Sequence, residues 1–218
     1  MSIRIGVVGG TGRLGYGLAV RAARAGYRTA IGSRSKEKAS RVADQARCEY
    51  GVEIDALSNT ETVGVCDLVV LSVPFAGRAD LLIELRDAIE GCSDVRPIVL
   101  DVCVPFRSVE SADEKTALSA AEETQAILGE NVTVVSGLHT VSSHVLLPPE
   151  RPIAADALVC GNNPEANSVV VEVCRRMGIR AFDSGALARS RIAEGLTPII
   201  ITLNKQHKTR DIGIRFTI

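Results

Sequence analysis

The chain has 218 residues, of which 46% are hydrophobic and 23% are charged, and its formal net charge is −1. This length corresponds to one domain, or to one domain with a small appendage, and it is long enough to bury a substantial core. The near-neutral charge excludes a general nucleic-acid binder. Apolar runs are too short for a membrane span of about 20 residues. No signal peptide precedes the first expected strand, so we expect a cytoplasmic protein.

Charge is unevenly distributed along the chain. Residues 1–50 contain ten Lys or Arg and three Asp or Glu, whereas residues 51–130 contain five and sixteen. A basic N-terminal block suits an anionic ligand because it attracts phosphate groups. A solvated helix face would produce the same composition. The six cysteines form no C-x-x-C pair and no metal-site spacing, so we expect buried reduced thiols and no metal site.

The first 35 residues predict one βαβ unit. A buried strand at 3–8 is followed by a glycine-rich turn, and apolar residues then recur at helical spacing as far as Gly26. A second strand follows at 27–31. Strands and helices continue to alternate in the following expected order: a helix from Ser35 to about 49, strands at 52–55 and 67–73, a helix at 79–89 with Ala79, Leu82, Ile83, Leu85 and Ile89 on its apolar side, a strand at 97–104, a helix from a capping box at Ser111 to about 128, and a strand at 132–138.

Six strands alternating with helices predict a Rossmann-type α/β fold with a doubly wound, mostly parallel sheet. The pattern changes after His139. There we expect an ordered loop at 139–153, a strand at 157–161, a helix from Asn163 to Gly178, a strand at 180–183, and a long helix at 188–208 that Pro198 should kink or split. The expected domains are a Rossmann domain at 1–138 and a smaller C-terminal α/β domain at 139–218.

The glycine-rich turn fits the pattern G-x-G-x-x-G and stands between a strand and a helix, which is the setting that makes this pattern specific for a dinucleotide. Gly10 would allow the tight turn, Gly12 would leave room for a pyrophosphate, and Gly15 would let helix and strand pack closely. Backbone N–H groups and the helix dipole would then hold the anion. The site residues expected here are Gly10, Thr11, Gly12, Arg13 and Leu14.

The end of the second strand indicates the type of nucleotide. NAD-binding proteins commonly carry an acidic residue about 20 residues after the turn, but Gly32-Ser33-Arg34 stands here instead. Ser33 can donate a hydrogen bond, and Arg34 supplies a fork of donors with a charge. Lys38 lies one turn into the next helix. Together with Thr11, these residues favour NADP(H) over NAD(H), although a solvated helix start would also explain the two cations.

The nicotinamide should lie beyond the carboxyl ends of later strands, at 72–75 and 103–105. Val73, Phe75 and Val104 make these ends apolar. A dry slot suits hydride transfer, although simple core packing would give the same residues. The chain shows no Tyr-x-x-x-Lys arrangement for acid–base catalysis. The second reactant is therefore expected to be a hydride acceptor such as a flavin-like ring.

Several segments along nearly the whole chain resemble those of one protein family. They are residues 9–15, 32–34 with Lys38, 135–140, 183–187, 190–191, 194–198 and 213–216. Together they resemble the NADPH-dependent coenzyme F420 reductases, also called F420H2:NADP oxidoreductases. The resemblance implies reversible hydride transfer between NADP(H) and coenzyme F420, an 8-hydroxy-5-deazaflavin, by a homodimer or higher homo-oligomer. Phe75 departs from the Trp of some members, and 141–143 is more polar than the Ile-Pro-Ala found in others.

The resemblance also implies roles for individual residues. Thr11, Ser33, Arg34 and Lys38 would hold the 2′-phosphate, and the nicotinamide would lie near Val73, Phe75 and Val104. The residues that would line the deazaflavin site are His139, Val141, Ser143 and Ile212. His139 could hydrogen-bond the deazaflavin near its N1, or it could be a satisfied structural histidine at the end of a strand. We assign no catalytic residue.

Two other classes of function stay open from the sequence. One is an NADPH-dependent reductase of another acceptor, either flavin or ferric iron or an imine such as pyrroline-carboxylate. The other is a non-catalytic NADP(H)-binding module. The residues beside the expected nicotinamide offer no evident donor for an imine or carbonyl substrate, and this favours a deazaflavin.

Overall fold

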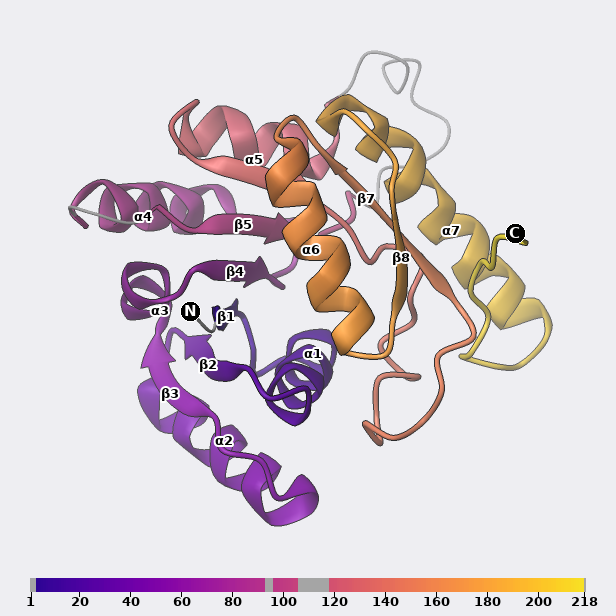
Figure 1. Cartoon of the computed structure of the whole chain (residues 1–218), viewed down its shortest axis with the longest axis horizontal. Coiled ribbons are helices and arrows are strands. Elements are labelled where there is room, and N and C mark those ends of the chain that lie inside the picture. Colours follow the sequence, from indigo (N-terminus) through magenta and orange to yellow (C-terminus); the bar gives the residue numbers. More distant parts are fainter. Residues whose placement is uncertain (1–2, 93–95, 106–117, 218) are drawn as a thin grey trace.

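The computed structural model describes residues 3–92, 96–105 and 118–217. These residues contain one sheet of eight strands in the order β3-β2-β1-β4-β5-β6-β7-β8 (Figure 1). The strands are β1 (Arg4–Val8), β2 (Arg28–Ser33), β3 (Asp55–Ser58), β4 (Leu68–Leu71), β5 (Ile98–Asp101), β6 (Thr133–Ser136), β7 (Asp156–Gly161) and β8 (Arg180–Asp183). All neighbouring strands are parallel except β6 and β7. The predicted Rossmann-type fold is confirmed, since β1 to β6 follow the order 3-2-1-4-5-6.

The helices lie on both faces of the sheet (Figure 1). They are α1 (Arg13–Arg24), α2 (Lys36–Tyr50), α3 (Asn59–Val65), α4 (Ala79–Glu90), α5 (Ala120–Leu128), α6 (Pro164–Arg176), the 3-10 helix η2 (Leu187–Arg189) and α7 (Ser190–Gln206). Ile5 and Val7 of β1 share a core with α1, α2 and α6, whereas Val8 shares the opposite core with α3, α4 and α5. A central parallel strand is covered on both sides, which explains its unbroken apolar run.

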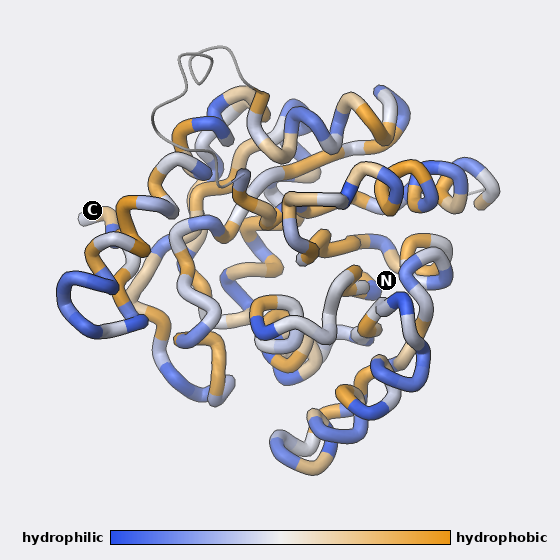
Figure 2. Tube along the Cα trace, turned by 180° about the vertical axis from the view of Figure 1, so that it is seen from behind, coloured by the Kyte–Doolittle hydropathy of each residue, from blue (hydrophilic) through white to orange (hydrophobic). Residues whose placement is uncertain are grey.

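Most element boundaries follow local signals in the sequence. The Ser35 side chain accepts a hydrogen bond from the Lys38 backbone N–H (3.2 Å) and so caps α2, as predicted. Asn163 caps α6 in the same way, with Pro164 in the first turn. Figure 2 shows hydrophilic and hydrophobic residues alternating along α2, which is typical of a helix with one face on a sheet.

Several predicted elements differ from the structure. The strand expected at 52–55 lies at 55–58, and α3, which was not predicted, follows it directly. The predicted helix start at Ser111 lies outside the described residues, and α5 begins at Ala120 behind its own capping box of Ser119 and Glu122. Ile83, expected on the apolar side of α4, is 42% exposed. Pro198 does not split α7, which runs on to Gln206.

The long loop after β6 is ordered, as predicted, because a buried arginine binds its backbone. The Arg21 guanidinium of α1 donates to the carbonyl oxygens of Leu146 (2.6 Å) and Arg151 (2.7 Å) and to that of Met177 (3.0 Å). Each bond pairs a buried charge with a backbone dipole, so the arginine is not left unsatisfied in the core. This contact fixes the loop against α1, and the loop then continues into β7.

The cysteines are all free. The four that stand in apolar runs of the sequence are buried, as expected: Cys66, Cys103, Cys160 and Cys174. Cys48 is exposed and Cys92 is half-buried. Among the described residues, no group of three His, Cys, Asp or Glu side chains is arranged to hold a metal ion. The same residues include no helix that is both long and apolar enough to cross a membrane.

Candidate functional site

The glycine-rich turn joins β1 to α1. Gly9 adopts the left-handed conformation (φ +76°), and the Gly10 N–H donates to the Val7 carbonyl (3.1 Å). Gly9 supplies the left-handed residue of the tight turn. Glycine is also required at position 10, as predicted, because a Cβ there would lie 2.8 Å from the Val7 carbonyl oxygen. Gly12 is the N-cap of α1; no side chain caps this helix, and its first turn contains no acidic residue. The first backbone N–H groups of α1 are thus open to an anion.

Glycines 12 and 15 have different physical roles. A Cβ on Gly15 would lie 2.9 Å from both the Gly10 Cα and the Gly9 oxygen, so only glycine lets α1 pack this closely on the turn. A Cβ on Gly12 would meet only the Gly9 oxygen, at an ordinary 3.5 Å. Protein packing therefore does not require glycine at position 12. Its small size leaves space at the exposed start of α1, where an anion would approach.

The end of β2 lies directly beside this turn, because the N–H groups of Gly9 and Gly10 both donate to the Gly32 carbonyl (3.1 and 3.2 Å). Ser33 is buried, and its Oγ accepts a hydrogen bond from the Ser35 N–H. Arg34 and Lys38 are exposed, and neither forms an ion pair within the described ranges. Two cations that pair with no described carboxylate thus follow the strand that contacts the glycine-rich turn.

A cavity of about 710 Å³ lies beyond the carboxyl ends of β4, β5 and β6. Residues 73–76, 102–104 and 138–144 form its walls together with α7 and the chain that follows α7. The structure brings seven of the predicted site residues together around this cavity: Leu14, Val73, Phe75, Val104, His139, Val141 and Ser143. Since Leu14 belongs to the first turn of α1, the cavity begins beside the glycine-rich turn.

The other predicted residues do not line the cavity. Gly10, Thr11, Gly12, Arg13, Ser33, Arg34 and Lys38 belong to the turn, the start of α1, the end of β2 and the start of α2. Ile212 also lies outside the lining, but its N–H donates to Oδ1 of Asn204 (3.1 Å), which does line it. Apart from Ile212, the predicted set therefore divides into a group at the glycine-rich turn and the end of β2, which the sequence predicts to hold the nucleotide (the nucleotide-anchoring group), and a cavity group.

His139 is buried in the cavity wall. Neither ring nitrogen forms a hydrogen bond of normal geometry with a described residue. Burial lowers the pKa of His139 to about 4 despite the opposing charge of Asp101, so the ring is neutral at physiological pH. The Cys103 backbone also lies near the ring and opposes this shift, but among the described residues the hydrogen-bonding capacity of the ring is not fully used. An unpaired buried nitrogen costs free energy, and a ligand that hydrogen-bonds to it would remove that cost.

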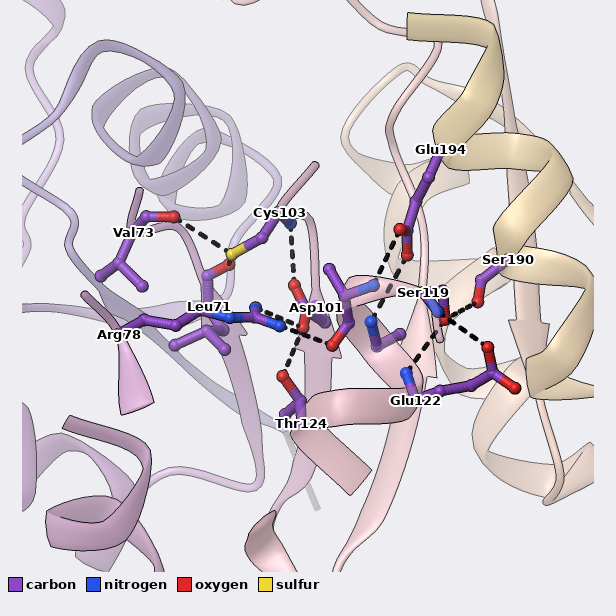
Figure 3. A network of polar contacts seen from close by, with 12 residues as sticks. Leu71, Val73, Arg78, Asp101, Cys103, Ser119, Glu122, Thr124, Ser190 and Glu194 are labelled. Carbon is purple, nitrogen blue, oxygen red and sulfur yellow. Dashed lines mark hydrogen bonds and ion pairs between the residues drawn. The ribbon is translucent and has the colours of Figure 1, made fainter. Parts of the chain in front are cut away.

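A buried network that the sequence reasoning missed supports one cavity wall (Figure 3). Asp101, at the end of β5, accepts hydrogen bonds from Arg78 Nη1 (2.9 Å), Thr124 Oγ1 (2.6 Å) and the Cys103 N–H (2.8 Å). The side chains of Arg78 and Asp101 are 4% and 0% exposed. The Arg78 guanidinium also lies 4.7 Å from the centroid of the Phe75 ring, so the network holds a ring that lines the cavity.

A second missed residue, Glu194, connects α7 to α5. Its carboxylate accepts hydrogen bonds from the backbone N–H groups of Ala120 (2.8 Å) and Ala121 (3.4 Å) at the start of α5. Burial raises the pKa of Glu194 to about 7. One and two turns later, Thr197 and Ile201 of α7 line the cavity. Glu194 therefore fixes the helix that forms the outer cavity wall.

Comparison with known proteins identifies the family. A family model described as "NADP oxidoreductase coenzyme F420-dependent" matches residues 4–105. The F420-dependent NADP reductase of Methanocaldococcus jannaschii is 37% identical, over 99% of this chain and 98% of that protein. The chain belongs to the F420-dependent NADP oxidoreductase family. The F420-dependent NADP reductase of Methanothermobacter thermautotrophicus is 34% identical, over 100% of this chain and 96% of its own.

The similarity to this F420-dependent family extends beyond residues 4–105. The matched range 4–105 contains the turn, the end of β2 and the apolar ends of β4 and β5, but it stops before the loop that carries His139. The full-length relatives cover that loop and α7 as well. A crystal structure of a protein from Arthrobacter sp. FB24 has a TM-score of 0.80 over 100% of both chains, at 21% identity, and it shows the same fold.

Proposed function

We propose that this protein catalyses reversible hydride transfer between NADP(H) and coenzyme F420. The observation that carries this proposal is the apolar cavity that begins beside an uncapped, glycine-started helix and ends at α7. Such a cavity suits two flat rings, one anchored through phosphates at the turn and one inserted from the α7 side. The full-length relatives named F420-dependent NADP reductase support the same conclusion.

The residues of the nucleotide-anchoring group fit NADP(H). The uncapped N–H groups of α1 suit the diphosphate, and the space at Gly12 leaves that approach open. We infer that Thr11, Ser33, Arg34 and Lys38 bind the 2′-phosphate. Arg34 and Lys38 form no ion pair with the residues that the structure describes, and no carboxylate ends β2. Arg13 adds a further positive charge at the exposed start of α1.

The cavity group would orient the rings and exclude water. When bound, NADPH supplies a hydride and F420 accepts it. Val73, Phe75 and Val104 would form the apolar wall beside the nicotinamide, while Val141, Ser143 and Ile212 belong to the deazaflavin side. The neutral His139 ring can donate a hydrogen bond to the deazaflavin near N1, where negative charge gathers. No protein group needs to transfer a proton for the hydride to move.

An absorbance assay tests the proposed reaction. Protein mixed with NADPH and oxidised F420 should bleach the deazaflavin absorbance band, and F420H2 with NADP+ should restore it. The same protein should show much lower rates with FMN, with a ferric chelate and with pyrroline-carboxylate. Failure to bleach F420, together with reduction of one of these other acceptors, would favour an NADPH-dependent reductase of that acceptor. Nucleotide binding without any turnover would favour a non-catalytic module.

We also propose that the protein is a homo-oligomer that associates through α7. Ile192, Ile199 and Leu203 are 70%, 55% and 37% exposed, and their spacings of seven and four residues place them on one helix face. Ile199→Asp should therefore shift the protein to a monomer in sedimentation velocity. Ile83→Asp on α4, where Ile83 is 42% exposed, is the matched control and should leave the assembly unchanged. A monomeric wild type would contradict the proposal.

We also propose that two parts of the chain bind different ligands. Residues 1–138 would bind NADP(H), and residues 139–218 would complete the deazaflavin site through the loop after β6 and α7. Substitutions in α7 that weaken F420 binding but not NADPH binding would support this division.

A cytoplasmic location is proposed as well, and fractionation of cells that produce the protein would test it.

A further inference from the structure

The cavity opening is formed by two segments that are far apart in the sequence. The Ser142 hydroxyl donates to the Arg210 carbonyl (2.6 Å), which connects the loop after β6 to the chain that follows α7. Asn204 of α7 accepts two further hydrogen bonds. Its backbone carbonyl accepts from the Thr209 N–H (3.0 Å), and its side-chain Oδ1 accepts from the Ile212 N–H (3.1 Å). These bonds hold residues 207–212 along the opening, so the side chains that they carry have defined positions.

Basic side chains gather at this opening. His144, Lys205 and Arg210 line the cavity, and Arg210 Nη1 lies 3.2 Å from His144 Nε2. Burial, with the charges of Arg13 and Arg210, lowers the pKa of His144 against the opposing charge of Asp211. The Asp211 carboxylate, adjacent in the chain, is already paired with Arg151 (2.7 Å).

Positive charge at the opening is not neutralised by the protein. In the part of the chain that the structure describes, Lys205 and Arg210 form no ion pair. Like charges repel, so this arrangement is unfavourable unless an anion is present. The walls behind the opening are mostly apolar, so the expected ligand combines an apolar ring with an anionic extension.

We propose that Lys205 and Arg210, with His144, bind the anionic side chain of the deazaflavin substrate. This inference rests on the proposed function. Coenzyme F420 carries a phosphodiester and glutamate carboxylates at the end of its side chain, and a ring placed in the cavity directs that chain to the opening. A guanidinium and an ammonium are the groups that bind phosphate and carboxylate. The diphosphate of NADP(H) has related chemistry, so the test must separate the two ligands.

Titration of deazaflavin fluorescence, without NADP(H), tests this proposal. Two ligands are compared: F420 and FO, the same ring and ribityl chain without the phosphate and glutamates. Wild type should bind F420 more tightly than FO. The double substitution Lys205→Ala with Arg210→Ala should raise the Kd for F420 about tenfold or more and leave that for FO within about twofold. The Arg210 backbone carbonyl, which Ser142 binds, is retained in this variant.

Lys208→Ala is the matched control, because Lys208 is exposed, close in sequence and absent from the cavity lining. It should leave both Kd values unchanged. A double variant that weakens F420 and FO equally would overturn the proposal, since the cations would then shape the ring site. A separate titration with NADPH gives the last comparison: a double variant that loses affinity for NADPH alone would also overturn the proposal and would assign the cations to the diphosphate. Wild type that binds FO as tightly as F420 overturns this inference alone, whereas wild type that binds neither overturns the proposed function as well.

Discussion

Asp101→Asn should unfold about 6–20 °C below wild type. Asparagine keeps the shape of the side chain and can still accept the Cys103 N–H, but it leaves the Arg78 guanidinium buried without a counter-charge. Breaking a buried ion pair by removing one charge costs about 3–5 kcal/mol. For a chain of this size each kcal/mol lowers the melting temperature by about 2–4 °C. Thermal unfolding followed by circular dichroism, with urea unfolding as a second measurement, would check the value.

Asp44→Asn is the matched control for this substitution. Asp44 and Arg47 form an ion pair at 2.6 Å, shorter than the 2.9 Å of the buried pair, but their side chains are 61% and 57% exposed. Solvent screens such a pair, so its loss should change stability by about 1 kcal/mol at most. Adding Arg78→Met to Asp101→Asn should recover part of the loss because the unpaired charge is then removed. If Asp101→Asn and Asp44→Asn lowered the stability of the fold equally, burial would not strengthen the contribution of the Arg78–Asp101 pair to that stability.

The N-terminal half of the fold could be predicted because its signals are local. A buried strand, a glycine-rich turn and a helical apolar pattern follow one another within 35 residues, and they form β1, α1 and β2. Ser35 and Asn163 mark helix starts because their side chains bind backbone N–H groups within the same turn. The signal for α3 was also present, since Ser58 and Glu61 form a capping box, but the helix is too short to show an apolar period.

The buried polar residues of the site could not be predicted in this way. Asp101 binds residues 23 positions before and after it, and Glu194 binds the backbone of residues 74 and 73 positions earlier. These pairings arise from tertiary packing, which no short sequence pattern encodes. The pairing of β7 with β6 is of the same kind. By contrast, residues such as Val73, Phe75 and Val104 were predictable because the carboxyl ends of parallel strands meet at one edge of the sheet.

Arg34→Ala should raise the KM for NADPH about 10- to 150-fold and leave the KM for NADH nearly unchanged. A hydrogen bond to a charged group contributes about 1.5–3 kcal/mol, and each 1.4 kcal/mol corresponds to a factor of ten. Arg34 is exposed and has no ion-pair partner in the ranges described, so its removal should not destabilise the fold. NADH lacks the 2′-phosphate and therefore should not be affected. Steady-state kinetics with both nucleotides and saturating F420 would measure the two effects.

Arg47→Ala on the same helix is the control for a general change in charge. Arg47 is also exposed, but it lies at the end of α2 and pairs with Asp44, away from the turn that would hold the nucleotide. Its loss removes one positive charge, as the loss of Arg34 does, and should leave both KM values within about twofold. An equal rise for NADPH and NADH in Arg34→Ala would mean that Arg34 does not contact the 2′-phosphate. The preference for NADP(H) would then have to come from Ser33, Lys38 and Thr11, because those are the remaining donors beside the turn.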